Sequence, residues 1–250
     1  MKNNANVAII LPNYNSHLYL NETIKSIINQ SYTKWRLIIV DDCSNKKTKD
    51  LLKKFDKKKK IKIYWLQKNR GAGYCRNFAI KKTNLKYLAF IDSDDIWKKH
   101  KLKNQINYME KNNFDFTYTY YETFGNRKKF VTPPKKLNFI DFVKNTSIGT
   151  STMIVKTKAA KQISFTNTKI CEDYYYKCKI LKKVKYAYCL DQFLTKYRIR
   201  NDSLQGSSLK NIYWIWKINK KYNNMSLLQN LISLIFISIN SIRKYGFKSF

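Results

Sequence analysis

The sequence predicts an α/β fold, with a mostly parallel sheet flanked by helices and a helical tail at the C-terminus. Two patterns predict it. Short apolar runs alternate with segments that carry apolar residues at helical spacing, which is typical of parallel sheets with helices on both faces. Polar clusters follow these apolar runs, and in such sheets ligands bind beyond the carboxyl ends of the strands.

The first hundred residues contain four of the apolar runs. We expect strands at Val7–Leu11, Leu37–Val40, Ile61–Leu66 and Tyr87–Ile91. Helical spacing between them predicts helices around Leu18–Ile28, around Leu51–Phe55 and from about Cys75. The polar clusters are Pro12–Asn15, Asp41-Asp42, Asn69–Arg76 and Asp92–Asp95. They should gather at one edge of the sheet.

The second half of the chain is less regular. We expect strands at Phe114–Glu122 and Thr150–Val155, a turn at Gly125-Asn126 and a helix at Cys171–Leu181. Tyr186–Leu190 and Phe193–Ile199 are expected to form a strand pair around Asp191-Gln192.

The tail from Leu209 to Tyr245 is helical in pattern, with Leu227–Ile242 as its most apolar part. Five polar residues interrupt that part, which is also short for a membrane span of ~20 apolar residues. Packing on the domain and docking on a membrane surface both fit, and we favour packing. Arg243, Lys244 and Lys248 would suit an anionic surface.

Composition excludes disorder and defines the charge. Hydrophobic residues make up 44% of the 250 residues, which is typical of a globular protein. Lys and Arg number 50 against 16 acidic residues, a formal net charge of +34 that favours polyanions. The lysines are spread along the chain, so compositional bias explains most of this charge. The five cysteines lack CxxC spacing, which argues against disulfides and a zinc site.

The acidic cluster Asp92-Ser93-Asp94-Asp95 is the first candidate site. Adjacent carboxylates repel each other unless a cation neutralises them, and hard metals such as Mg²⁺ or Mn²⁺ bind oxygen ligands. Asp95 has a second interpretation as a helix N-cap before Ile96-Trp97. We prefer metal and donor binding for Asp92 and Asp94.

Three other clusters each have a functional and a structural interpretation. Glycines in Asn69–Asn77 would let the backbone approach a phosphate, although an ordinary turn looks the same. Asp41 could bind a base or ribose, or cap the helix beyond Ser44, and Tyr14 could stack on a base. Glu172-Asp173 could supply a general base, or only complement a helix dipole.

Six ordered segments together resemble the family 2 inverting glycosyltransferases of the Rossmann-like GT-A fold, of the bacterial surface-polysaccharide type. They are Ala8–Ser44, Asn69–Ile80, Tyr87–Trp97, Gly149–Val155, Cys171–Leu181 and Tyr197–Leu204. The segment YLAFIDSDDIW contains the DxD motif, and CEDYYYKCKIL contains the Glu-Asp pair. Only Asp115–Ser147 is poorly matched within this span.

The resemblance implies a role for each matched position. Donor-binding roles fall on Pro12, Tyr14, Asp41, Arg76, Asp92, Ser93, Asp94 and Arg200. Asp92 and Asp94 would hold Mn²⁺ or Mg²⁺ on the diphosphate of a UDP-sugar, and Asp173 would be the catalytic base. Many relatives have His at the position of Arg200, which can pair with the diphosphate but cannot bind a metal.

The implied reaction moves a hexose or N-acetylhexosamine from a UDP-sugar to a hydroxyl of a glycan or lipid-linked glycan, in lipopolysaccharide, lipooligosaccharide or capsule synthesis. Residues 1–205 would form the GT-A domain, with 1–100 as the nucleotide-sugar half and 101–205 as the acceptor half. Residues 206–250 would form the basic, apolar tail. Without a signal-peptide pattern, we expect the cytoplasm, with peripheral contact to the inner face of its anionic membrane.

Two rival classes remain open. Net charge and nineteen tyrosines suggest a nucleic-acid or polyanion-binding protein, but basic residues occur on nearly every predicted helix instead of in one patch. We therefore expect no nucleic-acid partner. A catalytically inactive relative that binds only the donor is the other rival, and the intact Asp92, Asp94 and Asp173 argue against it.

Overall fold

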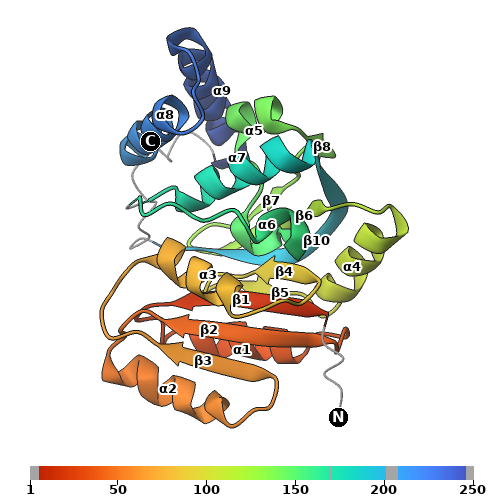
Figure 1. The fold of residues 1–250 in the computed structure, drawn as a ribbon, viewed down its shortest axis with the longest axis vertical. Helices are drawn as coiled ribbons and strands as arrows, with labels where there is room; N and C mark the ends of the chain where they lie inside the picture. The colour runs from red at the N-terminus through yellow and green to blue at the C-terminus, as the bar shows by residue number, and fades with distance from the viewer. Residues whose placement is uncertain (1–5, 169, 201–207, 246–250) are drawn as a thin grey trace.

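A computed structural model describes residues 6–168, 170–200 and 208–245 (Figure 1). The strands are β1 (Val7–Asn13), β2 (Trp35–Asp41), β3 (Ile61–Trp65), β4 (Tyr87–Phe90), β5 (Ile96–Trp97), β6 (Phe116–Gly125), β7 (Lys129–Val131), β8 (Lys136–Leu137), β9 (Ile154–Lys156) and β10 (Ala187–Ile199). The helices are α1 (Leu20–Ile28), α2 (Lys46–Asp56), α3 (Ala72–Lys81), α4 (Lys101–Lys111), α5 (Phe139–Asn145), η1 (Thr150–Thr152, a 3₁₀ turn), α6 (Thr157–Ala160), α7 (Glu172–Val184), α8 (Ser208–Lys221) and α9 (Leu227–Tyr245).

Within the described residues, the strands form one sheet in the order β3-β2-β1-β4-β9-β6-β10-β5, with β7 beside β6 and β8 beside β10. Strands β3, β2, β1 and β4 run parallel to one another, as do β6 and β10. Strand β9 is antiparallel to both β4 and β6. The predicted α/β fold with a mostly parallel sheet is therefore confirmed.

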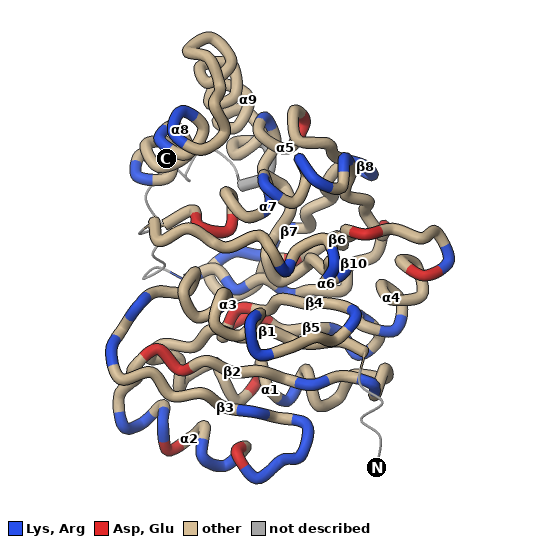
Figure 2. The backbone as a smooth tube through the Cα atoms, in the orientation of Figure 1, with Lys and Arg blue, Asp and Glu red and all other residues tan. Residues whose placement is uncertain are grey.

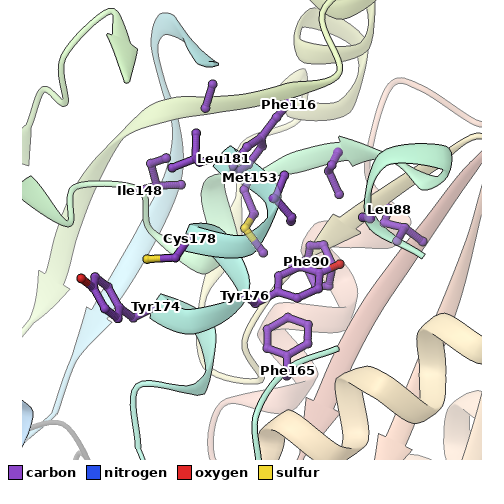
Figure 3. Close-up of a cluster of buried hydrophobic side chains, with 14 of the residues drawn as sticks. Leu88, Phe90, Phe116, Ile148, Met153, Phe165, Tyr174, Tyr176, Cys178 and Leu181 are labelled. Carbon is purple, nitrogen blue, oxygen red and sulfur yellow. The ribbon is translucent and has the colours of Figure 1, made fainter. Parts of the chain in front are cut away.

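Alternate side chains of the parallel strands point to two separate cores. Ala8 and Ile10 of β1 belong to the core under α3, α5 and α7, and Figure 3 shows part of it. Phe165 and Tyr176 stack there with ring centroids 3.8 Å apart. Val7 and Ile9, on the other face, join the core under α1, α2 and α4. Burial on both faces explains why these strands have continuous apolar sequences.

Two predictions in the second half are wrong. Thr150–Val155 is not one strand, because η1 occupies its first three residues and only Ile154–Lys156 is extended. The Thr152 hydroxyl donates to the Gly149 carbonyl at 2.7 Å, a local bond that competes with strand pairing. Tyr186–Ile199 is not a strand pair either. It is essentially one strand, β10, whose register with β6 shifts between Leu190 and Thr195, so Asp191-Gln192 lies in a bulge.

The tail forms a helical hairpin that packs on the domain. Ile215 and Ile218 of α8 and Ile237 of α9 belong to the core that contains α7. Ser233 also donates a hydrogen bond to the Val143 carbonyl of α5 at 2.5 Å. Among the helices that the structure describes, none is both long and apolar enough to cross a bilayer. Lys248 and Asn201–Leu204 lie outside the described residues.

Candidate active site

The carboxyl ends of β1 and β2 meet in a buried network around Asp41. Asp41 lies opposite Asn13 in the parallel register and accepts a hydrogen bond from its Nδ2 atom at 2.7 Å. The second oxygen of Asp41 accepts the N–H of Ser44 at 3.0 Å. Asn45, not Asp41, is the N-cap of α2, so the capping interpretation of Asp41 is wrong. Its contact with a nucleoside stays a prediction.

Tyr14 lies on the turn that follows β1. The turn is fixed by Asn15, which has φ of 49° and whose side chain accepts the N–H of Asn45 at 2.8 Å. Pro12 is buried at the end of β1, whereas the Tyr14 side chain is 53% exposed. An exposed ring on an ordered turn is suited to stacking on a nucleobase.

Asp42 holds the glycine-containing loop, a role that the sequence did not reveal. Its two carboxylate oxygens accept the backbone N–H groups of Arg70 and Gly71, each at 2.7 Å. Gly71 has φ of +87° and precedes α3, so the loop needs its conformational freedom. Gly73 has a different reason, because a Cβ there would lie 2.7 Å from the Thr166 carbonyl oxygen. Gly73 therefore allows α3 to pack closely against the backbone at Thr166.

Arg76 joins the DxD segment to the start of α7. Its guanidinium is 5% exposed and pairs with Asp92 at 2.6 Å and with Glu172 at 2.7 Å. Burial alone would lower the pKa of Arg76, but Asp92 and Glu172 hold it above its ordinary value. Arg76 therefore lies beside the DxD segment, with both terminal nitrogens engaged by carboxylates.

The acidic cluster follows β4 at the same edge of the sheet. Asp92 is 31% exposed and Asp94 is 18% exposed at the side chain, while Asp95 is buried. Burial, and then the charge of Asp92, raise the pKa of Asp94 to about 6 although Arg200 opposes the shift. Ser93 anchors the turn through its carbonyl, which accepts the Thr23 hydroxyl at 3.1 Å. The ion pair with Arg200 therefore does not fully offset the effects of burial and of Asp92 on Asp94.

Asp95 is not a helix cap, which corrects the alternative interpretation. Ile96–Trp97 forms β5, and helix α4 begins only at Lys101. The Asp95 carboxylate instead accepts hydrogen bonds from the Ser151 hydroxyl and from the backbone N–H of Arg198, the latter at 2.9 Å. Asp95 therefore ties the DxD turn to η1 and to β10.

Two arginines of the β10 end hold the same turn. Arg198 donates from Nε to the Asp94 carbonyl at 2.9 Å and pairs with Glu22 of α1 at 2.6 Å. Arg200 pairs with the Asp94 carboxylate at 3.2 Å and lies over the ring of Tyr19. Arg200 is thus close enough to the acidic cluster to reach a diphosphate bound there. Sequence reasoning missed Arg198, although it lies in the same segment.

Asp173 lies in the first turn of α7, where its carboxylate is held by two side chains. Its Oδ2 atom accepts the Thr150 hydroxyl at 2.8 Å and pairs with Lys177 at 2.6 Å. Burial would raise the pKa of Asp173, but the Lys177 charge outweighs it and holds the pKa below its ordinary value. Both contacts use Oδ2, and among the described residues Oδ1 has no hydrogen-bond donor. Asp173 is therefore an anion with one oxygen available.

The acidic residues fit a divalent cation without forming a complete cage. Within residues 6–168, 170–200 and 208–245, no three His, Cys, Asp or Glu side chains converge as metal ligands. Asp92 and Asp94 offer carboxylate oxygens, the donor type that Mg²⁺ and Mn²⁺ prefer, and the charge of Asp92 still raises the pKa of Asp94. Mg²⁺ commonly binds one or two carboxylates together with substrate phosphates, so two protein ligands suffice.

A cavity of about 740 Å³ lies at the opposite edge of the sheet, against Lys86, Glu110 and Lys156. Three of its charged side chains form ion pairs, Lys86 with Glu110 at 3.1 Å and Lys156 with Asp115 of the neighbouring strand end at 2.8 Å. The predicted site residues do not line it. They meet at the carboxyl edge, where Arg76 connects Asp92 to the helix that carries Asp173.

The family model for glycosyl transferase family 2 matches residues 8–173, a span that contains the acidic cluster, Arg76 and Asp173. The chain belongs to that family. It is 31% identical over 243 residues to the Bacillus subtilis protein named putative teichuronic acid biosynthesis glycosyltransferase TuaG, covering 95% of this chain and 96% of the relative. It is 32% identical over 247 residues to the Escherichia coli enzyme UDP-Glc:alpha-D-GlcNAc-diphosphoundecaprenol beta-1,3-glucosyltransferase WfgD, covering 96% and 95%.

Solved structures share the fold. S. aureus TarS in complex with UDP-GlcNAc superposes with a TM-score of 0.74 at 21% identity, over 94% of this chain and 74% of TarS. The mannosyltransferase PcManGT from Pyrobaculum calidifontis, in complex with GDP-Man and Mn²⁺, superposes with a TM-score of 0.70 at 13% identity, over 98% and 71%. The predictions of a family 2 glycosyltransferase and of a GT-A fold are confirmed.

Proposed function

We propose that this glycosyltransferase moves a hexose or N-acetylhexosamine from a UDP-sugar to a hydroxyl of a lipid-linked precursor of a cell-surface glycan, with inversion at the anomeric carbon. The observation that carries the proposal is the buried bridge from Asp92 through Arg76 to Glu172. It holds the donor-side carboxylates and Asp173 at one edge of the sheet. The named activities of the E. coli relatives supply the donor and acceptor classes.

The donor would lie across the carboxyl ends of β1, β2 and β4. The exposed ring of Tyr14 would stack on the uracil, with Pro12 and Asp41 shaping the pocket below it. Arg200, beside Asp94, would pair with the diphosphate. Asp92 and Asp94 would hold Mn²⁺ or Mg²⁺, which supplies Lewis-acid stabilisation of charge on the departing UDP.

Asp173 would act as the general base. It is ionised at neutral pH because Lys177 holds its pKa low. The acceptor hydroxyl would dock on Oδ1, since Thr150 and Lys177 occupy Oδ2. As the acceptor oxygen bonds to the anomeric carbon, its proton passes to Asp173 and the UDP oxygen leaves on the opposite side. A single displacement of this kind inverts the anomeric configuration.

Calorimetric titration of UDP into the purified protein tests the donor site, first with Mn²⁺ and then with EDTA. We expect micromolar binding that weakens when the metal is removed. Product analysis with UDP-glucose, UDP-GlcNAc and an undecaprenyl-diphosphate-linked GlcNAc acceptor then tests transfer. Absence of UDP binding in both conditions would contradict the donor assignment. Binding without transfer to any lipid-linked acceptor would contradict the acceptor class.

A further inference from the structure

Helix α9 presents an apolar face to solvent, while its protein-facing side combines apolar and polar residues. Its exposed or half-exposed residues recur three or four positions apart, so they form one stripe along the helix. The stripe, called the apolar face of α9, consists of Leu228, Leu231, Ile232, Ile235, Phe236 and Ile239. Leu228 is 67% exposed, and Ile235 is 57% exposed.

The opposite side of α9 packs on the protein and carries the buried polar residues Asn230 and Ser233 beside the apolar Ile237. Asn219 of α8 donates to Asn230 at 3.1 Å and to Ser233 at 3.2 Å. Asn240 donates to the Lys144 carbonyl of α5 at 3.0 Å. These bonds fix the helix rotation, because turning the apolar face inward would leave buried polar groups without partners. The hydrogen bonds of the hairpin therefore keep the apolar face of α9 exposed.

Basic residues border this apolar face. Lys220 and Lys221 end α8 and are exposed, and α9 begins six residues later at Leu227. Lys144 of α5 lies 5.7 Å from the Phe236 ring centroid. Residues 203–250 contain no Asp or Glu. Figure 2 shows α9 almost free of charged residues, with Lys-bearing α8 beside it.

We infer that the α8–α9 hairpin docks on an anionic lipid surface, with the apolar face of α9 entering the headgroup region and the lysines of α8 binding lipid phosphates. An apolar helix face bordered by basic residues is the pattern of interfacial helices. A second copy of the chain fits less well. Two such hairpins would bring like charges together in a protein whose net charge is +34.

Co-sedimentation of the full chain with vesicles tests this inference without donor or acceptor, so its outcome does not depend on the proposed reaction. The vesicles contain phosphatidylcholine alone, or phosphatidylcholine with about one third phosphatidylglycerol, at low and high salt. We expect binding to the mixed vesicles that weakens with salt. No binding to mixed vesicles at low salt would overturn the inference.

Three triple variants separate apolar insertion from general attraction of a basic protein. L231Q/I235Q/I239Q should lower the partition coefficient by at least about tenfold. K217Q/K220Q/K221Q should lower it by about fivefold per lysine and reduce its salt dependence. K54Q/K57Q/K58Q makes the same charge change at the α2 end of the molecule, far from the hairpin in Figure 1, and should retain wild-type binding within about twofold.

Three results would overturn the inference. In the first, the α9 triple variant binds as well as the wild type. In the second, the α2 variant loses as much binding as the α8 variant, which would indicate unspecific attraction. In the third, the wild type is a dimer, the α9 triple variant is a monomer, and neither protein binds vesicles. Urea unfolding and UDP titration of each variant confirm that it is folded.

Discussion

Replacing Arg76 with Met removes the cation that joins Asp92 to Glu172. The side chain of Arg76 is 5% exposed and that of Glu172 is 12% exposed, so the variant leaves a buried carboxylate without its partner. Removing one member of a buried ion pair typically costs about 3–5 kcal/mol. Because Asp92 is 31% exposed and can be solvated, we expect the lower end of this range.

Urea unfolding followed by tryptophan fluorescence measures this loss. R36M provides the control, since Arg36 is exposed on β2, and it should change the free energy of unfolding by less than about 0.5 kcal/mol. R76M/E172Q should recover part of the loss, because it removes the uncompensated charge as well. A decrease below about 1 kcal/mol for R76M would refute a stabilising role of the bridge.

Four further predictions concern the site and the core. D173N should keep UDP affinity and lose about 10²–10⁴-fold in turnover, measured by product formation, because it removes the base; unchanged turnover would contradict this role. D94N should weaken UDP binding in Mn²⁺ by at least about tenfold in calorimetry and leave binding in EDTA less affected. K177M should raise the pKa of Asp173, because the Lys177 charge is the main influence that opposes the effect of burial. The acid limb of the pH–rate profile should then move to higher pH. An acid limb that stays in place would show that another group titrates. Lys101 is fully buried, and its Nζ has no hydrogen-bond partner among the described residues. Burial lowers its pKa, so between the folded and unfolded pKa values the unfolded state binds one more proton than the folded state. The free energy of unfolding of the wild type should therefore rise with pH up to the unfolded pKa of about 10.4. K101M should remove this pH dependence and add about 1–3 kcal/mol in urea unfolding at neutral pH.

The strands that could be predicted are those whose burial is encoded locally. Every residue of β1 is buried, so its apolar run continues without alternation and marks the strand directly. β10 was harder, because the exposed Asp191 and Gln192 interrupt the apolar pattern. Their bulge depends on the register with β6, which is some seventy residues away in sequence and cannot be read from local composition.

The same contrast between local sequence signals and long-range contacts applies to the candidate site. The positions of Asp92, Asp94 and Asp173 could be proposed because motifs at strand and helix ends mark them. Their partners could not, because the contacts join distant segments. Asp95 meets Ser151, which is 56 positions away, and Arg198, which is 103 positions away. Lys177 is only one helical turn from Asp173, yet a lysine in an amphipathic helix usually signals an exposed face.

The hairpin and the proposed base are mechanically connected. Tyr174 follows Asp173 in α7, and its buried hydroxyl donates to Asn219 of α8 at 2.7 Å. Asn219 in turn holds Asn230 and Ser233 on the buried side of α9. Breaking one of these buried hydrogen bonds would leave its partner groups unpaired, so the network resists a change in the position of α9. The apolar face of α9 is therefore fixed relative to Asp173, so docking that face on lipid would set the height of the proposed base above the membrane, where the hydroxyl of the proposed lipid-linked acceptor would arrive.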